Sequence, residues 1–141
     1  MNKKVVGIAY IKEGKLLVCM SQRSSKQGKY TLIGGGVEPG ETSEQAVIRE
    51  TREETGFELK NGEFYKIFSF TESAASDPNL LIDMDVFVYN GEFSQKLQTS
   101  DEILKFRWYD ISEDSSNLSS SITDHFLPWA IDNDLLYSDK K

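Results

Sequence analysis

Three glutamates, Glu50, Glu53 and Glu54, lie close together in the middle of the chain. On a helix, residues three and four positions apart share one face, so these carboxylates would crowd an arc of about 100°. Like charges at this spacing repel by about a few tenths of a kcal/mol per pair, and a cation offsets that cost. Mg²⁺ prefers oxygen ligands and commonly lies between carboxylates and substrate phosphates. The cluster therefore indicates either a magnesium site or a solvated acidic helix face.

The flanking residues predict the helix that would carry this cluster. Thr42 is a good N-cap, and Gln45 three residues later completes a capping-box pattern. Residues 43–55 contain neither glycine nor proline, and Gly56 provides a stop signal. We therefore expect a helix over 43–55.

A glycine-rich segment comes just before that helix. Gly34 to Gly36 are followed by VEPGE, which predicts a sharp, irregular loop. Glycines allow a backbone to approach a phosphate or a metal where a Cβ atom would obstruct it. Within the helix, Arg49 is placed to pair with Glu53 one turn later.

The spacing of these residues resembles the Nudix box, G-x5-E-x7-R-E-U-x-E-E-x-G-U, where U is usually aliphatic. Segment 35–57 has every fixed glycine, glutamate and arginine of that motif, namely Gly35, Glu41, Arg49, Glu50, Glu53, Glu54 and Gly56. Two residues depart from the family pattern. Thr51 replaces an aliphatic residue, which we expect to soften the packing under the helix. Ile33 replaces a common proline, which we expect to alter the loop slightly.

The resemblance implies a hydrolase that cleaves a nucleoside diphosphate linked to another moiety, with Mg²⁺ or Mn²⁺ as cofactor. Carried over to this chain, it implies a set of metal ligands: Glu50, Glu53, Glu54 and the carbonyl of Gly34. It implies that Glu53 could also orient or deprotonate the attacking water. Glu41 and Arg49 would hold the loop against the helix through an ion pair, and Gly35 and Gly56 would be structural.

Two further candidates lie outside the motif. Arg23 is expected to contact phosphate, as an arginine before the box does in many members, or else to be a solvated loop residue. Many members also take a catalytic carboxylate from a distal loop, and here Glu102 is the first candidate and Asp101 the second. The alternative is an exposed loop acid. In such a site, cations neutralise phosphate oxygens and lower the pKa of a bound water.

Composition limits the remaining classes. The 141 residues suit a single domain over 1–141, and a net charge of −7 argues against sequence-independent binding to nucleic acid or anionic membranes. The single cysteine, Cys19, excludes an intrachain disulfide, and the single histidine, His125, excludes a His/Cys zinc site. We expect Cys19 to be an inert core thiol and His125 a surface or packing residue. A cytoplasmic location is expected, and the resemblance allows a homodimer.

The whole chain predicts an α+β fold, a Nudix-type α/β/α sandwich with one mixed sheet of six or seven strands. The strands are expected at 5–11, 15–20, 57–60, 63–70, 80–89, 92–97 and 106–109, and 30–33 is a short apolar run. Polar loops are expected at 21–29, 71–79 and 112–121. A second helix is expected from Ile122, weakened by Pro128, with Phe126 and Trp129 in the core or in a base pocket. The tail after about 137 is expected to be disordered.

The substrate expected first is a nucleoside triphosphate, including a modified or oxidised one, cleaved to a monophosphate and pyrophosphate. The reason is the chain's minimal length, similar to MutT-type members. ADP-ribose or another sugar nucleotide is the alternative, and a non-catalytic ligand-sensing module is the alternative of another class. The motif is shared by all of them, so it leaves open the base, the sugar, the phosphorus attacked, the general base and the number of metal ions.

Overall fold

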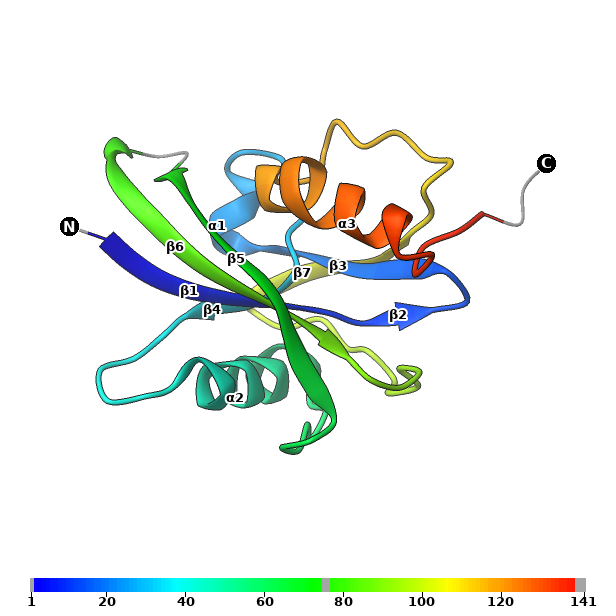
Figure 1. Ribbon diagram of the computed structural model, residues 1–141, viewed down its shortest axis with the longest axis horizontal. Helices are drawn as coiled ribbons and strands as arrows, with labels where there is room; N and C mark the ends of the chain where they lie inside the picture. The colour runs from blue at the N-terminus through cyan, green and yellow to red at the C-terminus, as the bar shows by residue number, and fades with distance from the viewer. Residues whose placement is uncertain (1, 75–76, 139–141) are drawn as a thin grey trace.

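The computed structural model describes residues 2–74 and 77–138. Its strands are β1 (Asn2–Ala9), β2 (Ile11–Lys12), β3 (Lys15–Ser21), β4 (Ile33–Gly36), β5 (Phe64–Ala74), β6 (Asp77–Tyr89) and β7 (Ile103–Tyr109). Its helices are α1 (Gln22–Ser25), α2 (Ser43–Thr55), the π-helix η1 (Ser121–Phe126) and α3 (Leu127–Asp132). Figure 1 shows α2 and α3 on opposite sides of the strands, which confirms the predicted α+β sandwich.

The strands form two sheets where one was predicted. The first has the order β4-β1-β6-β5 and is mixed, because β1 runs parallel to β6 and antiparallel to β4. The second has the order β2-β3-β7 and is antiparallel. The strand predicted at 5–11 is divided at the buried Tyr10, where the chain passes from the first sheet to the second. Nothing in the sequence over 5–11 indicates this crossing, because it is an unbroken run of β-branched and apolar residues.

The longest hairpin, β5–β6, differs most from prediction. Its register pairs Phe70 with Met84 and Thr71 with Asp83, so 71–74 and 77–79 are strand residues and not a loop. The strands predicted at 57–60 and 92–97 do not form. The polar composition of 71–79 suggested a loop because this end of the hairpin is largely exposed, so few apolar residues mark the strand.

Two apolar clusters fill the space on either side of the first sheet. Tyr10, Leu17, Val47 and Phe87 belong to the cluster that reaches α2. Phe126 belongs to the other cluster, and Trp129 packs against it, so these aromatic rings serve the core. No helix in the described part of the chain is both long enough and apolar enough to span a membrane.

Two single residues illustrate how the core treats polar atoms. Cys19 is buried, as predicted, and burial raises the pKa of its thiol to about 12. Thr51 lies on the buried face of α2, and its hydroxyl hydrogen-bonds the Tyr10 hydroxyl at 2.9 Å. The threonine hydroxyl therefore has a partner in the core, as buried polar groups generally do.

Both short helical elements answer a specific prediction. The predicted loop 21–29 contains α1, whose N-cap Ser21 accepts a hydrogen bond from the Ser24 backbone N–H at 3.0 Å.

The C-terminal helix is present, but it begins as η1, and Pro128 lies in the first turn of α3. Pro128 is the second residue of α3, where the π-helix η1 passes into the α-helix, so the helical run over 121–132 accommodates the proline at this junction. Residues 139–141, the end of the predicted disordered tail, lie outside the described residues.

Candidate active site

Helix α2 begins and ends where the sequence predicts. Thr42 Oγ1 accepts from the Gln45 backbone N–H at 3.1 Å, and Gln45 Oε1 accepts from the Thr42 N–H at 2.9 Å. Gly56 ends the helix in the left-handed conformation, with φ 79°. The residues that α2 buries are Ala46, Val47, Thr51 and Thr55. Glu50 and Glu54, four residues apart, therefore lie along the border of this buried face.

The three glutamates of α2 occupy unequal environments. Glu54 is the most enclosed, and its Oε1 accepts a hydrogen bond from the Gly34 backbone N–H at 3.2 Å. The Glu50 side chain is 15% exposed, whereas the Glu53 side chain is 52% exposed. The helix thus offers two partly buried carboxylates, Glu50 and Glu54, and an exposed one, Glu53.

Burial dominates the electrostatics of Glu54. Burial, together with a hydrogen bond and charge repulsion from Glu50, raises the pKa of this carboxyl to about 10, against the lowering effect of the Gly34 N–H. In the metal-free protein, Glu54 therefore keeps its proton at neutral pH. A divalent cation supplies the positive charge that would allow both carboxylates to ionise, so this pair fits a metal that binds with release of a proton.

Arg49 fastens the loop before α2 to the helix. Its guanidinium makes a bidentate ion pair with Glu41, from Nε to Oε2 at 2.8 Å and from Nη2 to Oε1 at 2.9 Å. Nη2 also donates to the Gly36 carbonyl at 2.9 Å, and Nη1 donates to Glu50 Oε1 at 2.9 Å. Hydrogen bonding to Arg49 lowers the pKa of Glu41 to about 2. The predicted partner Glu53 is the more distant one, at 3.4 Å from Nη1.

The three glycines form a strand and not part of the irregular loop expected, which instead comprises 37–41. Gly34 to Gly36 form most of β4, which pairs antiparallel with β1 at the edge of the first sheet. A Cβ on Gly34 would lie 2.1 Å from the Val6 carbonyl oxygen, and a Cβ on Gly35 would lie 2.6 Å from Glu50 Oε1. Glycines are needed here because β1 and the Glu50 carboxylate come so close to the strand.

Gly35→Ala tests this close approach directly. The added methyl group is expected to displace the Glu50 carboxylate from its position beside Arg49 and to weaken Mg²⁺ binding by about tenfold, with little loss of folding stability. The measurement is the rise in melting temperature as Mg²⁺ is added. Gly36→Ala is the matched control, because its Cβ would meet only Lys3 Cε at 3.7 Å. Equal Mg²⁺ responses in the two variants would contradict the prediction.

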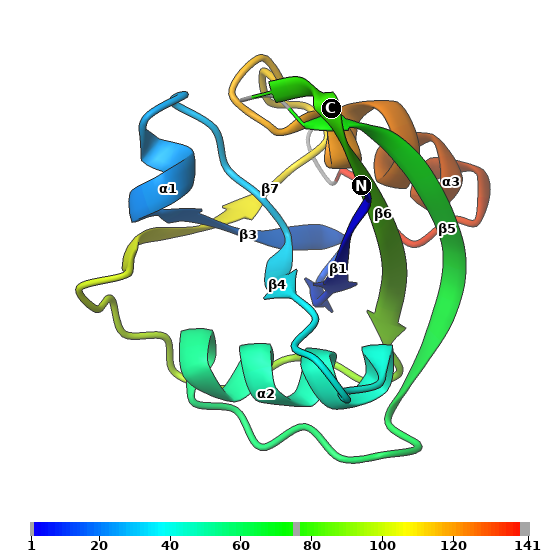
Figure 2. The same ribbon diagram turned by 90° about the vertical axis from the view of Figure 1, so that its left-hand side faces the viewer.

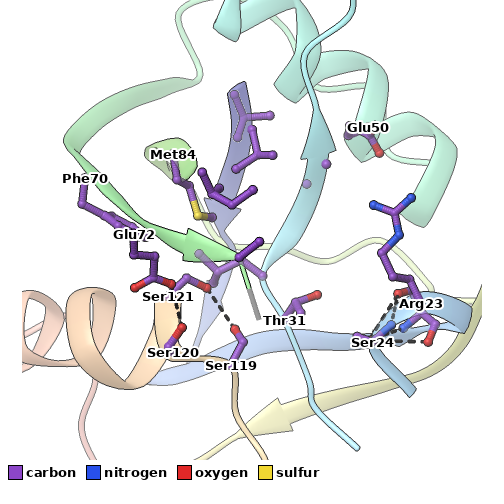
Figure 3. A pocket seen from close by; sticks show the side chains of 18 of the residues that line it. Arg23, Ser24, Thr31, Glu50, Phe70, Glu72, Met84, Ser119, Ser120 and Ser121 are labelled. Atoms are coloured by element: carbon purple, nitrogen blue, oxygen red, sulfur yellow. Dashed lines mark hydrogen bonds between the residues drawn. The ribbon is translucent and has the colours of Figure 1, made fainter. Parts of the chain in front are cut away.

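A cavity of about 660 Å³ opens beside this strand, which is a typical size for a small-molecule site. One end is lined by Arg23, Gly34, Gly35, Glu50 and Glu102. The other end is lined by Phe70, Glu72, Met84 and the serines 119–121. Figure 3 shows Arg23 extending toward Glu50 at the first end, with Glu72 and the serines grouped at the second.

The two candidates outside the motif both reach the first end of the cavity. Arg23 comes from α1, and Glu102 comes from the segment just before β7. The Gln22 backbone N–H donates to the Glu102 carbonyl at 2.8 Å, which holds the two segments together (Figure 2). Asp101 is not among the lining residues, and its carbonyl accepts from the Gln22 side chain at 2.8 Å. The tertiary structure thus favours Glu102 over Asp101.

The motif carboxylates do not converge into a closed metal cage. Of the three, only Glu50 lines the cavity. Within residues 2–74 and 77–138, no three histidine, cysteine or acidic side chains form a group that could hold a metal by themselves. The donor chemistry fits an open site, because Mg²⁺ usually binds one or two carboxylates and fills its other positions with water and phosphate.

Two acidic residues of this region were missed by the sequence analysis. Asp85 is buried, and its carboxylate accepts from Ser43 at 2.7 Å and from Ser69 at 2.6 Å, so it ties the start of α2 to the first sheet. The available signal was that two acids, Asp83 and Asp85, interrupt the apolar run 80–89. Glu72 lies in the segment predicted as a loop, and nothing local to it indicated a place in a cavity.

Known proteins resemble this chain over most of its length. The family profile described as NUDIX domain matches residues 1–130. The ADP-ribose pyrophosphatase of Methanocaldococcus jannaschii is 31% identical over 81% of this chain and 63% of its own length. The oxidized purine nucleoside triphosphate hydrolase of Danio rerio is 27% identical over 79% of this chain and 69% of its own length. The chain spans only 21% and 38% of the two NAD-capped RNA hydrolases that it matches in Photobacterium profundum and Vibrio parahaemolyticus.

A solved structure agrees at the level of the fold. The MutT NUDIX hydrolase from Burkholderia pseudomallei superimposes with a TM-score of 0.72, at 20% identity, over 94% of this chain and 97% of that one. At this identity the likeness concerns the fold alone.

Proposed function

The chain belongs to the Nudix family, which confirms the resemblance of its segment 35–57, and on that premise we propose that it is a Mg²⁺-dependent pyrophosphohydrolase. The proposed substrate is a nucleoside triphosphate, which would be cleaved to a monophosphate and pyrophosphate. The observation that carries the proposal is the cavity end that Glu50, Glu102 and Arg23 line together beside the glycine strand.

The residues of α2 and β4 are suited to hold the metal. Glu50, Glu53 and Glu54 would supply carboxylate oxygens, and Gly34 a carbonyl. The Gly34 N–H already points at Glu54, and in a strand the N–H and C=O of one residue face the same side. A bound Mg²⁺ would supply charge neutralisation at phosphate oxygens and a water of lowered pKa. Mn²⁺ fits the same oxygen donors.

The chain's own residues then have distinct tasks. Arg49 holds the Glu50 carboxylate by a 2.9 Å hydrogen bond, so its orientation does not depend on the metal. Glu53 and Glu102 are the candidates to orient the attacking water or to take its proton. Arg23 would bind phosphate oxygens at the same end of the cavity as Glu50.

The distribution of charge in the cavity supports a triphosphate over ADP-ribose. Among the described residues that line it, Arg23 is the single arginine or lysine, and it lies at the Glu50 end. The opposite end carries Glu72, whose negative charge disfavours phosphate, and no arginine or lysine among the described lining residues. A nucleoside triphosphate has its charge at one end and a neutral base at the other, so its phosphates would lie at the Arg23 end and its base at the end without a cation. ADP-ribose has its charge in the middle and neutral groups at both ends.

Arg23→Ala is expected to raise the KM for the substrate by about tenfold or more, because a charge-assisted contact to phosphate is lost. Folding should be unaffected, since Arg23 is exposed. Lys26→Ala is the control, because Lys26 is an exposed cation three residues away that does not line the cavity. The steady-state KM of both variants is the readout, and an unchanged KM in Arg23→Ala would remove this residue from the site.

A hydrolysis screen with product identification tests the function. Purified protein with Mg²⁺ or Mn²⁺ would be given canonical and oxidised triphosphates, ADP-ribose, sugar nucleotides and dinucleoside polyphosphates. Monophosphate plus pyrophosphate from a triphosphate is the expected result. AMP plus ribose phosphate from ADP-ribose would establish the alternative, which the resemblance to the M. jannaschii enzyme favours. If the folded protein hydrolyses none of these compounds, the result would favour a ligand-sensing module.

A further inference from the structure

The end of the cavity away from Arg23 has a defined chemistry. Its walls combine the apolar side chains of Phe70, Ile82 and Met84 with the carboxylate of Glu72 and the serines 119–121. A flat ring with an apolar face and polar edges suits such walls, because it can contact the apolar residues while its edge reaches the carboxylate.

Glu72 is held in place from two sides. Its Oε1 accepts a hydrogen bond from the Ser120 hydroxyl at 2.6 Å, and its Oε2 lies 3.2 Å from His125 Nε2. The His125 ring is in turn stacked on Phe70, with centroids 3.6 Å apart and an interplanar angle of 9°. His125 is therefore a packing residue, and the group positions a carboxylate before any ligand arrives.

The fixed carboxylate retains capacity to accept. A carboxylate has about four lone-pair sites, and the two neighbours occupy one on each oxygen. The Glu72 side chain is 30% exposed, so a ligand in the cavity can reach it. Because Glu72 is an acceptor, it favours ligand groups that donate hydrogen bonds and repels groups that present lone pairs.

We infer that Glu72 determines which nucleobase the cavity accepts, and that it selects a guanine-type base. This inference rests on the proposed function, because it assumes that the phosphates occupy the Arg23 end. Guanine presents two adjacent N–H donors, from N1 and the 2-amino group, which match the two oxygens of one carboxylate. Adenine and cytosine place a ring-nitrogen acceptor beside their amino group, and uracil flanks its single N–H with carbonyls.

Equilibrium binding of nucleoside monophosphates tests the inference. GMP is expected to bind the wild-type protein about tenfold more tightly than IMP, which differs by lacking the 2-amino group. Glu72→Gln is expected to reduce this preference to nearly none, since it removes the charge and one acceptor while keeping the shape. Glu58→Gln is the matched control, because Glu58 is exposed and does not line the cavity. Isothermal titration calorimetry measures each dissociation constant.

A second variant guards against misfolding of the first. Ser120→Ala leaves the Glu72 charge in place but removes the hydroxyl that orients it, so an intermediate GMP preference is expected. Equal binding of GMP and IMP by the wild type would overturn the inference. An undiminished preference for GMP in a folded Glu72→Gln protein would also overturn it. A third contradicting result is that ribose 5-phosphate binds as tightly as GMP and loses affinity in that variant, since Glu72 would then contact the sugar and not the base.

The same proteins separate this inference from the proposed function. Hydrolysis of GTP and ITP at equal efficiency would support the pyrophosphohydrolase and overturn the role of Glu72. A Glu72-dependent preference for GMP without hydrolysis of any triphosphate would support the base selection and overturn the enzymatic assignment.

Discussion

Replacing Glu53 by glutamine is expected to lower Mg²⁺-dependent turnover by on the order of 10³-fold, because metal-ion stabilisation of the transition state is worth several kcal/mol. The change removes one negative charge and keeps the shape of the side chain. The Glu53 side chain is half exposed, and its contact with Arg49 is long at 3.4 Å, so folding should be nearly unaffected. The loss should therefore appear in kcat and not in the melting temperature.

The control for this substitution is Glu58→Gln, an equal change of charge on an exposed residue after the end of α2. It should leave turnover unchanged. Full turnover by Glu53→Gln would mean that Glu53 neither binds the metal nor acts on the water, and the proposed metal site would be wrong. This variant also separates an enzyme from a ligand-sensing module, since a sensor has no turnover to lose.

Replacing Glu54 by glutamine is expected to stabilise the metal-free protein and to abolish its stabilisation by Mg²⁺. The pKa of Glu54 is raised from 4.5 to about 10, mainly by burial. The unfolded chain then loses this proton near pH 4.5, whereas the folded chain keeps it until near pH 10. The contribution of Glu54 to stability is therefore full below pH 4.5 and is lost as the pH rises toward 10. At mildly alkaline pH, Glu54 therefore lowers the free energy of unfolding by on the order of a few kcal/mol.

Urea unfolding in EDTA at several pH values measures this effect. The difference in unfolding free energy between Glu54→Gln and wild type should be near zero at acid pH and should grow in favour of the variant as the pH rises. With saturating Mg²⁺, the order should reverse, because only the wild type offers the Glu54 carboxylate to the metal. Parallel pH profiles for the two proteins would show that Glu54 is not protonated in the metal-free fold.

Local sequence was sufficient for the helix that carries the chemistry. Its caps depend on contacts three residues apart, such as Thr42 with Gln45, and its glutamates share a face because of the helical repeat. The pairing of Glu41 with Arg49 spans eight residues within the motif, and the resemblance to the Nudix box was enough to predict it. The α+β class followed from the same periodicities.

Contacts between distant segments decided the rest. The glycine segment became a strand because β1 lies beside it, and 71–74 and 77–79 became strand residues because β5 and β6 pair with each other. The inequality among the glutamates of α2 depends on how deeply each is buried against β4. Glu72 and Glu102 line the same cavity although they lie thirty positions apart in the chain. Hydrogen bonds within one helical turn can be inferred from a sequence, but burial and charge arise only when remote segments pack, so the tertiary structure alone determined which carboxylates the cavity presents.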